Sequence, residues 1–188
     1  AFGSAFHNWG ITIPYMKKSG VNFTQIFDYC HNEEQKELAK KAPVHEVLLD
    51  MAVHKLPSPI VAQQYRIPNI WQGDLESETG MAMLSCDSKG PLSLMITKIW
   101  MDPHAGEVAV GRIYSGTIKH GDTVWALGGA KSERVQQVSM MVGGDRIQVP
   151  EVSSGNIVAL TGVRNAAAGV TFTRDEDATP FEPIRHYP

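Results

Sequence analysis

The stretch EVAVGRIYSGTIKHGDTVWALG, from Glu107 to Gly128, decides the fold. It is rich in residues that favour β-strands, and glycines interrupt it at Gly116 and Gly121. A glycine suits a tight corner where the backbone takes a positive φ or approaches another segment closely. The stretch therefore predicts a strand, a corner and a second strand, as found in a small β-barrel or β-sandwich.

The β pattern extends on both sides of this stretch, from Pro91 to about Phe172. Asp-Pro, Gly-Gly and Ser-Gly turns separate the apolar segments. About 90 residues with six short strands are enough for a closed or nearly closed barrel. The predicted strands are Leu92 to Met101, Glu107 to Ser115, Thr123 to Leu127, Arg134 to Met141, Ile157 to Thr161, and Val170 to Phe172.

Upstream of the barrel the sequence predicts short helices. Residues 1–5 indicate the end of a strand that turns into a loop, and Pro14 favours an extended segment over residues 12–16. Asn22 and Gln25 form a capping pattern before a helix whose apolar face is expected in the core. That face carries Phe23, Ile26, Phe27 and Cys30. A short polar helix over residues 33–41 follows.

A third helix is predicted from Val44 to Leu56, after Pro43. Its apolar stripe should fold back on the barrel or associate with another copy of the chain, because a large exposed apolar patch is unfavourable. The stripe consists of Val44, Val47, Leu48, Met51, Ala52 and Leu56. Residues 57–90 are rich in Pro, Gly, Ser and Asp, which predicts a mostly irregular connector with at most a short helix over residues 60–64.

Composition indicates an ordinary globular protein of 188 residues, with 43% hydrophobic and 20% charged residues. The net charge of −3 excludes a broadly basic nucleic-acid coat, so an RNA contact must come from a local patch. Cys30 and Cys86 show no metal-ligand or disulfide spacing and suit a reducing cytosol. No apolar run is long enough to span a membrane, so we expect a cytoplasmic protein.

Independent catalysis is not predicted. The chain lacks the G-x-x-x-x-G-K-[ST] phosphate loop, the N-K-x-D guanine motif and the G-x-S-x-G nucleophile elbow, so it should neither hydrolyse nor firmly hold GTP. His45 and His54 are two and a half helical turns apart and cannot share a metal ion. The acidic run at residues 175–177 is most simply a solvated loop, and no metal site is predicted.

Several motifs of the sequence resemble those of the translational GTPases. Gly111, Arg112, Gly116, Ile118, Gly121, Asp122 and Val124 match the G-R-x-x-x-G-x-I-x-x-G-D-x-V pattern of their second domain. The segments AFGSA, KELAKKAPVHEVLLDM, YRIPNIW, DPHAGEVAVGR and FEPIRHYP are similar to the elongation factor 2 family of archaea and eukaryotes. The resemblance covers essentially the whole chain.

The resemblance implies a mainly β fold: a six-stranded translation-factor barrel after a small helical remnant of an α/β GTPase domain. Residues 1–70 would be the end of the GTPase domain, 71–90 a connector, 91–183 the barrel and 184–188 the start of a linker. The start inside AFGSAF and the end after FEPIRHY predict a segment of a longer protein. That protein would use GTP and magnesium to drive movement of tRNA and mRNA through the ribosome.

The resemblance also implies site residues. Ser4 and Ala5 would approach the guanine base in the intact protein only, and the segment itself would hold no cofactor. The barrel would dock on small-subunit ribosomal RNA and contact the other domains of the factor. Basic residues near barrel turns can reach phosphates. They are Arg112, Lys119, His120, Lys131 and Arg134.

Three alternatives remain open at this point. Arg112 could be a structural residue and the lysines ordinary surface charges. The chain could be a free-standing barrel module that binds structured RNA. It could also come from another translational GTPase, such as a release or biogenesis factor, although the helical and connector segments resemble elongation factor 2 specifically.

Overall fold

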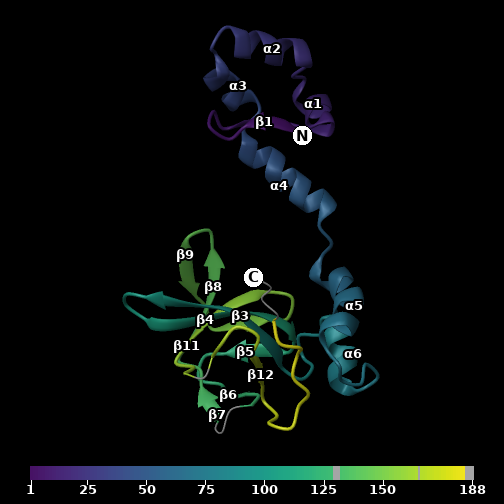
Figure 1. Cartoon of the computed structure of the whole chain (residues 1–188), viewed down its shortest axis with the longest axis vertical. Helices are drawn as coiled ribbons and strands as arrows, with labels where there is room; N and C mark the ends of the chain where they lie inside the picture. Colours follow the sequence, from purple (N-terminus) through teal and green to yellow (C-terminus); the bar gives the residue numbers. More distant parts are fainter. Residues whose placement is uncertain (129–131, 165, 185–188) are drawn as a thin grey trace. The chain divides into compact units, whose positions relative to one another are not determined.

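The computed structural model describes residues 1–128, 132–164 and 166–184. The chain divides into two compact units, Ala1–Pro57 and the residues from Ser58 onward (Figure 1). Each unit is considered by itself below. Within the described residues, no helix is long and apolar enough to cross a membrane.

The first unit combines a small antiparallel hairpin with four helices. The hairpin pairs β1 (Phe2–Ser4) with β2 (Trp9–Ile11). The helices are α1 (Ile13–Ser19), α2 (Phe23–His31), α3 (Gln35–Lys41) and α4 (Val44–Lys55). Their small core consists of Trp9, Ile11, Tyr15, Val21, Leu38, Ala42 and Val47.

Capping residues explain where the first helices begin. The extended segment predicted over residues 12–16 is wrong, because Thr12 caps helix α1 by accepting a 3.2 Å hydrogen bond from the Tyr15 amide. Pro14 lies in the first turn of α1, where its missing N–H costs no helical bond. The capping box predicted at Asn22 and Gln25 is confirmed, with both reciprocal hydrogen bonds present.

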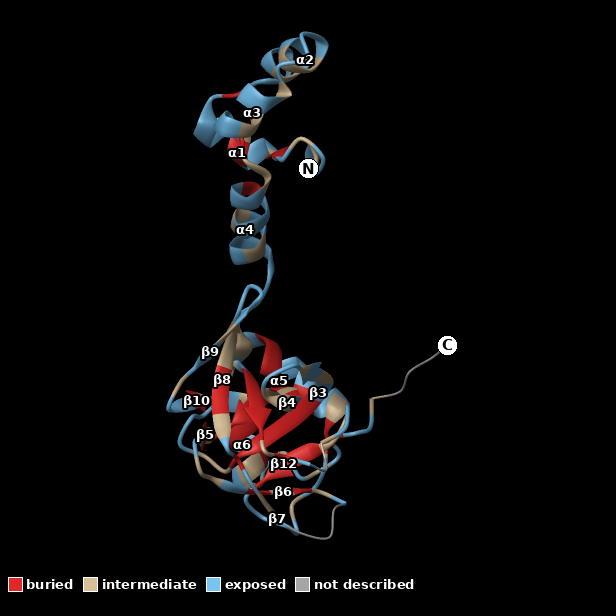
Figure 2. Cartoon of the chain, turned by 90° about the vertical axis from the view of Figure 1, so that its left-hand side faces the viewer, coloured by how far each residue is buried: buried red, intermediate tan, exposed pale blue. Residues whose placement is uncertain are grey.

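The apolar face of α2 is only partly the core face that the sequence predicted. Ile26 and Cys30 are partly buried against the core of the first unit, whereas Phe23 and Phe27 are exposed. No residue of α2 is fully buried, and its ribbon is mostly pale blue in Figure 2. Helix α4 buries only Val47, and its other large apolar side chains, Leu48, Leu49, Met51, Val53 and Leu56 beyond its end, are exposed. The physical reason is that two three-residue strands offer too little surface to cover these faces.

Two helices replace most of the connector expected over residues 57–90, so that prediction is wrong. They are α5 (Pro59–Ile70) and α6 (Glu78–Ser85). Proline at the first turn of α5 and the Ser77 cap of α6 start them, since Ser77 accepts a 3.1 Å bond from the Gly80 amide. Packing against the strands stabilises both helices despite Pro68 inside α5.

The second unit is mainly β, as predicted. Its largest sheet is antiparallel, in the order β7, β6, β12, β3, β4, β11, β8, β9, and β10 pairs with β5 in a separate ladder. The strands are β3 (Ser93–Asp102), β4 (Gly106–Ser115), β5 (Thr117–Lys119), β6 (Thr123–Ala126), β7 (Ser132–Arg134), β8 (Gln137–Val142), β9 (Asp145–Gln148), β10 (Glu151–Ser153), β11 (Ile157–Thr161) and β12 (Thr171–Thr173).

The six predicted strands correspond to β3, β4, β6, β8, β11 and β12. Four more strands, β5, β7, β9 and β10, have three or four residues each, too few to show an alternating pattern. Both ladders surround one core, because Ile118 of β5 and Val152 of β10 join it with residues of the large sheet. The buried strand segments are red in Figure 2.

A second apolar cluster attaches α5 and α6 to the outside of the strands. It joins Ile67, Trp71 and Met83 to Met95, Tyr114 and Phe181. Residues 179–182, which follow β12, hold this cluster in place by hydrogen bonds, and we call this segment the strap. The Trp71 indole donates a 2.8 Å hydrogen bond to the Thr179 carbonyl, the Glu182 amide donates to the Ile70 carbonyl, and the Phe181 amide donates to Thr171 Oγ1.

A β-bulge lies beside this cluster. Ser93 pairs with Ser115 and Leu94 with Ile113, so Tyr114 has no partner in the ladder between β3 and β4. The buried side chain of Gln63, on α5, donates its amide N–H groups to the carbonyls of Tyr114, at 2.9 Å, and Met83. Gln63 therefore supplies the donor that the bulge takes away from Tyr114.

Candidate nucleic-acid interface

The two glycines that the sequence singled out lie on either side of β5: Gly116 joins β4 to β5, and Gly121 lies in the corner between β5 and β6. Gly116 and Gly121 have φ values of 76° and 84°. A Cβ atom on Gly116 would lie 2.8 Å from the Leu92 Cα, so a side chain does not fit there. Directly after Gly121, Asp122 closes the turn by accepting a 2.9 Å hydrogen bond from the Lys119 amide. The corner is thus a fixed platform for the side chains around it.

Lys119 and His120 lie on this corner and are exposed. The Lys119 amine is 2.8 Å from a Glu151 carboxylate oxygen, and the two residues stand opposite each other in the ladder of β5 and β10. This hydrogen bond and the charge of Glu151 raise the pKa of Lys119. The His120 backbone is held by a 3.1 Å bond from its amide to the Pro150 carbonyl.

Arg174 is a third cation at the corner, and the sequence analysis did not identify it. Its guanidinium donates to Asp122 Oδ2 at 2.7 Å and to the Thr117 carbonyl at 2.8 Å. Arg174 directly follows β12, which pairs with β6. The pairing of β12 with β6 brings Arg174 to the corner. In the sequence alone, Arg174 is only the residue before the acidic run at 175–177.

Lys89 completes the group from a loop that the sequence predicted as connector. The loop is tied to the corner because Thr117 Oγ1 donates a 2.7 Å bond to the Ser88 carbonyl and the Gly116 amide donates to the Asp87 carbonyl. Lys89, Lys119 and Arg174 line one shallow depression together with Glu151. We call the three cations Lys89, Lys119 and Arg174 the basic corner.

The other predicted RNA residues have different positions. Arg134, at the end of β7, is exposed, and its guanidinium lies near Gly121 at the rim of the corner. Lys131 lies outside the described residues. Arg112 is on the face of β4 that carries Tyr114, with its guanidinium 5.9 Å from the centre of the Tyr114 ring. That contact is a cation–π contact, whereas the structural alternative for Arg112 was a hydrogen bond to its own hairpin, so both readings of Arg112 stay predictions.

Ser4 and Ala5, predicted to approach a guanine base, lie where β1 turns toward β2. Ser4 Oγ accepts a 3.3 Å bond from the His7 amide, and the Ala5 carbonyl accepts one from the Asn8 amide. Ala5 is exposed. An exposed turn is compatible with a contact to a base. Among the described residues, none next to Ser4 and Ala5 forms a phosphate loop.

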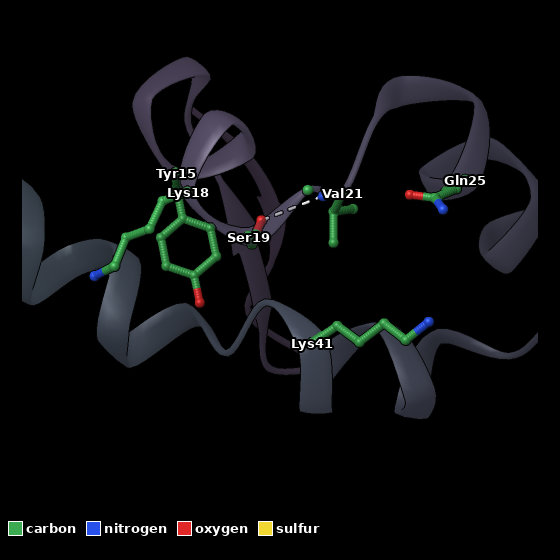
Figure 3. Close-up of a pocket in the computed structure, with 7 residues that line it drawn as sticks. Tyr15, Lys18, Ser19, Val21, Gln25 and Lys41 are labelled. Atoms are coloured by element: carbon green, nitrogen blue, oxygen red, sulfur yellow. Dashed lines mark hydrogen bonds between the residues drawn. The ribbon is translucent and has the colours of Figure 1, made fainter.

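A depression in the first unit shows why Lys18 and Ser19 do not form a phosphate site. They end helix α1, whose C-cap is Gly20, whereas a phosphate loop places Lys-Ser at the start of a helix, where the dipole attracts anions. Lys41 also lines the depression, but its amine points away from that of Lys18 (Figure 3). The two amines therefore do not converge on one anion.

Metal chemistry has no arrangement to support it in the described part of the chain. Residues 1–128, 132–164 and 166–184 contain no group of three or more His, Cys, Asp or Glu side chains placed to hold an ion. In the acidic run after Arg174, the Asp177 amide donates a 3.1 Å hydrogen bond to Asp175 Oδ1, as in a simple turn.

Known proteins resemble this chain along its whole length. Residues 91–175 match the family described as elongation factor G domain 2. The chain is 54% identical over 187 residues to elongation factor 2 of Picrophilus torridus, covering 100% of this chain and 25% of that protein. It is 53% identical over 187 residues to elongation factor 2 of Methanocaldococcus jannaschii, covering 99% and 26%.

A third relative, elongation factor 2 of Methanococcus aeolicus, is 56% identical over 188 residues, with 99% of this chain and 26% of that protein covered. The matches include the helical first unit as well as the barrel, which agrees with the resemblance found in the segments outside the barrel. The chain spans about a quarter of the length of these relatives. It belongs to the elongation factor 2 family.

Proposed function

We propose that this chain is the ribosome-docking and coupling part of a translation elongation factor that uses GTP and magnesium to promote translocation of tRNA and mRNA. The first unit, Ala1–Pro57, which lies within the segment 1–70 predicted to end the nucleotide domain, would have Ser4 and Ala5 near the guanine base. The barrel would bind small-subunit ribosomal RNA in the cytoplasm. Hydrolysis would depend on a phosphate loop outside this chain, since none is found in its sequence.

The basic corner is the observation that carries the docking proposal. Lys89, Lys119 and Arg174 gather at one depression although the whole chain carries a net charge of −3. Local positive charge on a rigid β platform is what phosphate contacts need, because such contacts fix the position of a protein on RNA without reading bases.

The test compares a double variant with a single variant in binding to purified small ribosomal subunits across a salt series. Lys119→Ala with Arg174→Ala should weaken binding and reduce the slope of log K against log salt by about one to two. Arg112→Ala, the matched single cation on the Tyr114 face, should leave the slope unchanged. A slope that falls only with Arg112→Ala would overturn the assignment of the basic corner.

The free-standing module remains a second candidate, and the size of the native protein separates the two. An antibody against this chain should detect a band several times heavier than 20.6 kDa in an extract of the source cells. That band should move onto ribosomes when a non-hydrolysable GTP analogue is added. A native band of 20.6 kDa would exclude the elongation-factor proposal.

A further inference from the structure

The two carboxylates at the basic corner have the same charge but different geometry. Glu151 bonds the free end of the Lys119 side chain, and both side chains are half exposed, at 51% and 58%. Asp122 is less exposed, at 22%, and bonds the Lys119 backbone together with the Arg174 guanidinium. Glu151 thus occupies the terminal amine of Lys119, whereas Asp122 holds the backbone of the turn and the Arg174 guanidinium in place.

Glu151 stands in the place that a phosphate oxygen would take. An ammonium group has three donors and no preferred partner, so a phosphate and the Glu151 carboxylate would compete for Lys119. An exposed ion pair of this kind is weak and exchanges readily. An incoming phosphate can therefore displace Glu151, at the expense of the ion pair.

Asp122 acts on the other side of Arg174. The guanidinium has five N–H donors in a rigid fork, and the bonds to Asp122 and the Thr117 carbonyl engage one of its terminal nitrogens. The remaining edge of the fork is held in a fixed direction, and 46% of the side chain is exposed. A preoriented guanidinium loses less conformational entropy when it binds a phosphate.

We infer that a backbone phosphate of RNA binds between Lys89, Lys119 and Arg174, that Glu151 is a built-in competitor for this site, and that Asp122 is a positioning residue for Arg174. The inference rests on the proposed docking function and deepens it. It requires the two carboxylates to have opposite effects on binding. Removing the charge of Glu151 should strengthen RNA binding, whereas the same change at Asp122 should weaken it.

The matched variants are Glu151→Gln and Asp122→Asn, with Glu107→Gln on the exposed edge of β4 as control. All three remove one negative charge and keep the side-chain shape, so any difference between them is local. Asparagine can still accept the Lys119 amide bond, so the turn at Asp122 is retained. Thermal unfolding of each variant checks that the barrel remains folded.

Binding of the full chain to small ribosomal subunits is measured by fluorescence anisotropy at several salt concentrations. Relative to Glu107→Gln, Glu151→Gln should bind about two- to fivefold more tightly, the range of an exposed ion pair. Asp122→Asn should bind about threefold or more weakly, as for a lost charge-assisted hydrogen bond. Equal effects of the two variants would overturn the inference, since only net charge would then matter.

The two proposals fail in distinguishable ways. If the unchanged chain does not bind the subunits at any salt concentration, the docking function fails. If it binds, but Glu151→Gln and Asp122→Asn shift affinity in the same direction, docking holds and the division of roles is wrong. A titration with inorganic phosphate, followed by the amide resonances of residues 117–119, should show tighter binding in Glu151→Gln. Identical phosphate titrations of that variant and the unchanged chain would also contradict the competitor role.

Discussion

Gln63 offers a sharp test of how helix α5 is joined to the barrel. Its side chain is 1% exposed and donates to the Tyr114 carbonyl that the bulge leaves without a ladder partner, and to the Met83 carbonyl. In the change Gln63→Glu, the size is kept but the NH₂ donor is replaced by an oxygen. A charged carboxylate would then face two carbonyl oxygens in a buried site.

The magnitude follows from protonation. A buried carboxyl that faces two carbonyl oxygens avoids its charge by keeping its proton, and the protonated form can still donate to one of the two carbonyls. Keeping that proton at pH 7, against an ordinary pKa near 4.3, costs about 3.7 kcal/mol. At pH 5 the same cost is about 1 kcal/mol.

The sign of the pH dependence is therefore fixed. The folded-state pKa of the introduced carboxyl lies above its unfolded value, so the variant is relatively most stable below pH 4.3 and loses stability as the pH rises toward the folded pKa. Relative to the unchanged chain, Gln63→Glu should lose about 2.7 kcal/mol of unfolding free energy between pH 5 and pH 7.

Urea unfolding followed by tryptophan fluorescence measures this loss. A Trp9→Phe background removes the tryptophan of the first unit, so that the signal reports on the second unit. Gln63→Met, of similar length and without a titrating group, is the matched control, and its difference from the unchanged chain should not vary with pH. A Gln63→Glu difference that is also independent of pH would refute the assignment of Gln63 as a buried donor to the bulge.

Three further predictions concern the rest of the chain. Gly111→Ala should destabilise the barrel by about 1–3 kcal/mol, because its Cβ would lie 2.4 Å from a β3 carbonyl oxygen, whereas Gly144→Ala, with open space around it, should not; thermal unfolding compares them. Hydrogen bonds from two backbone amides lower the pKa of Asp102 in the folded chain, so these bonds should hold the turn after β3 in place above pH 3.8 and be lost as the pH falls through the folded-state pKa. The amide chemical shifts of residues 104 and 105 measure this loss, and shifts that do not change with pH would contradict it. The exposed apolar side chains of α4 should cause self-association, measured by size-exclusion chromatography with light scattering; a monomer whose α4 amides exchange freely would contradict this.

The parts of the fold that were predictable are those with a local cause. The Asn22 capping box and the long strands β3 and β4, which are runs of β-forming residues bounded by turns, are specified by neighbours in sequence, so their patterns were sufficient. Helix α5 was predicted only as a possible short helix over residues 60–64, because Pro68 and the surrounding Pro and Ser residues argue against a longer helix locally. Packing of Ile67 against the β4 face outweighs that preference, and no local pattern reveals such packing.

The same distinction applies to the basic corner. Lys119, and His120 beside it, were predicted near this turn because they lie inside the motif that defines it, although His120 does not line the depression of the basic corner. Lys89 and Arg174 were not, since one lies 30 residues before Lys119 and the other 55 residues after it. Both reach the corner only through strand order and the hydrogen bonds of Thr117.

The strap that follows β12 has a mechanical consequence. Thr179, Phe181 and Glu182 fasten the end of the barrel sequence to the far end of helix α5, at Ile70 and Trp71. The first helix of this unit and the segment that follows its last strand are therefore clamped together. A pull applied at either end of the unit would be shared by the whole barrel instead of peeling off one strand. The unit can thus transmit force as a single solid part.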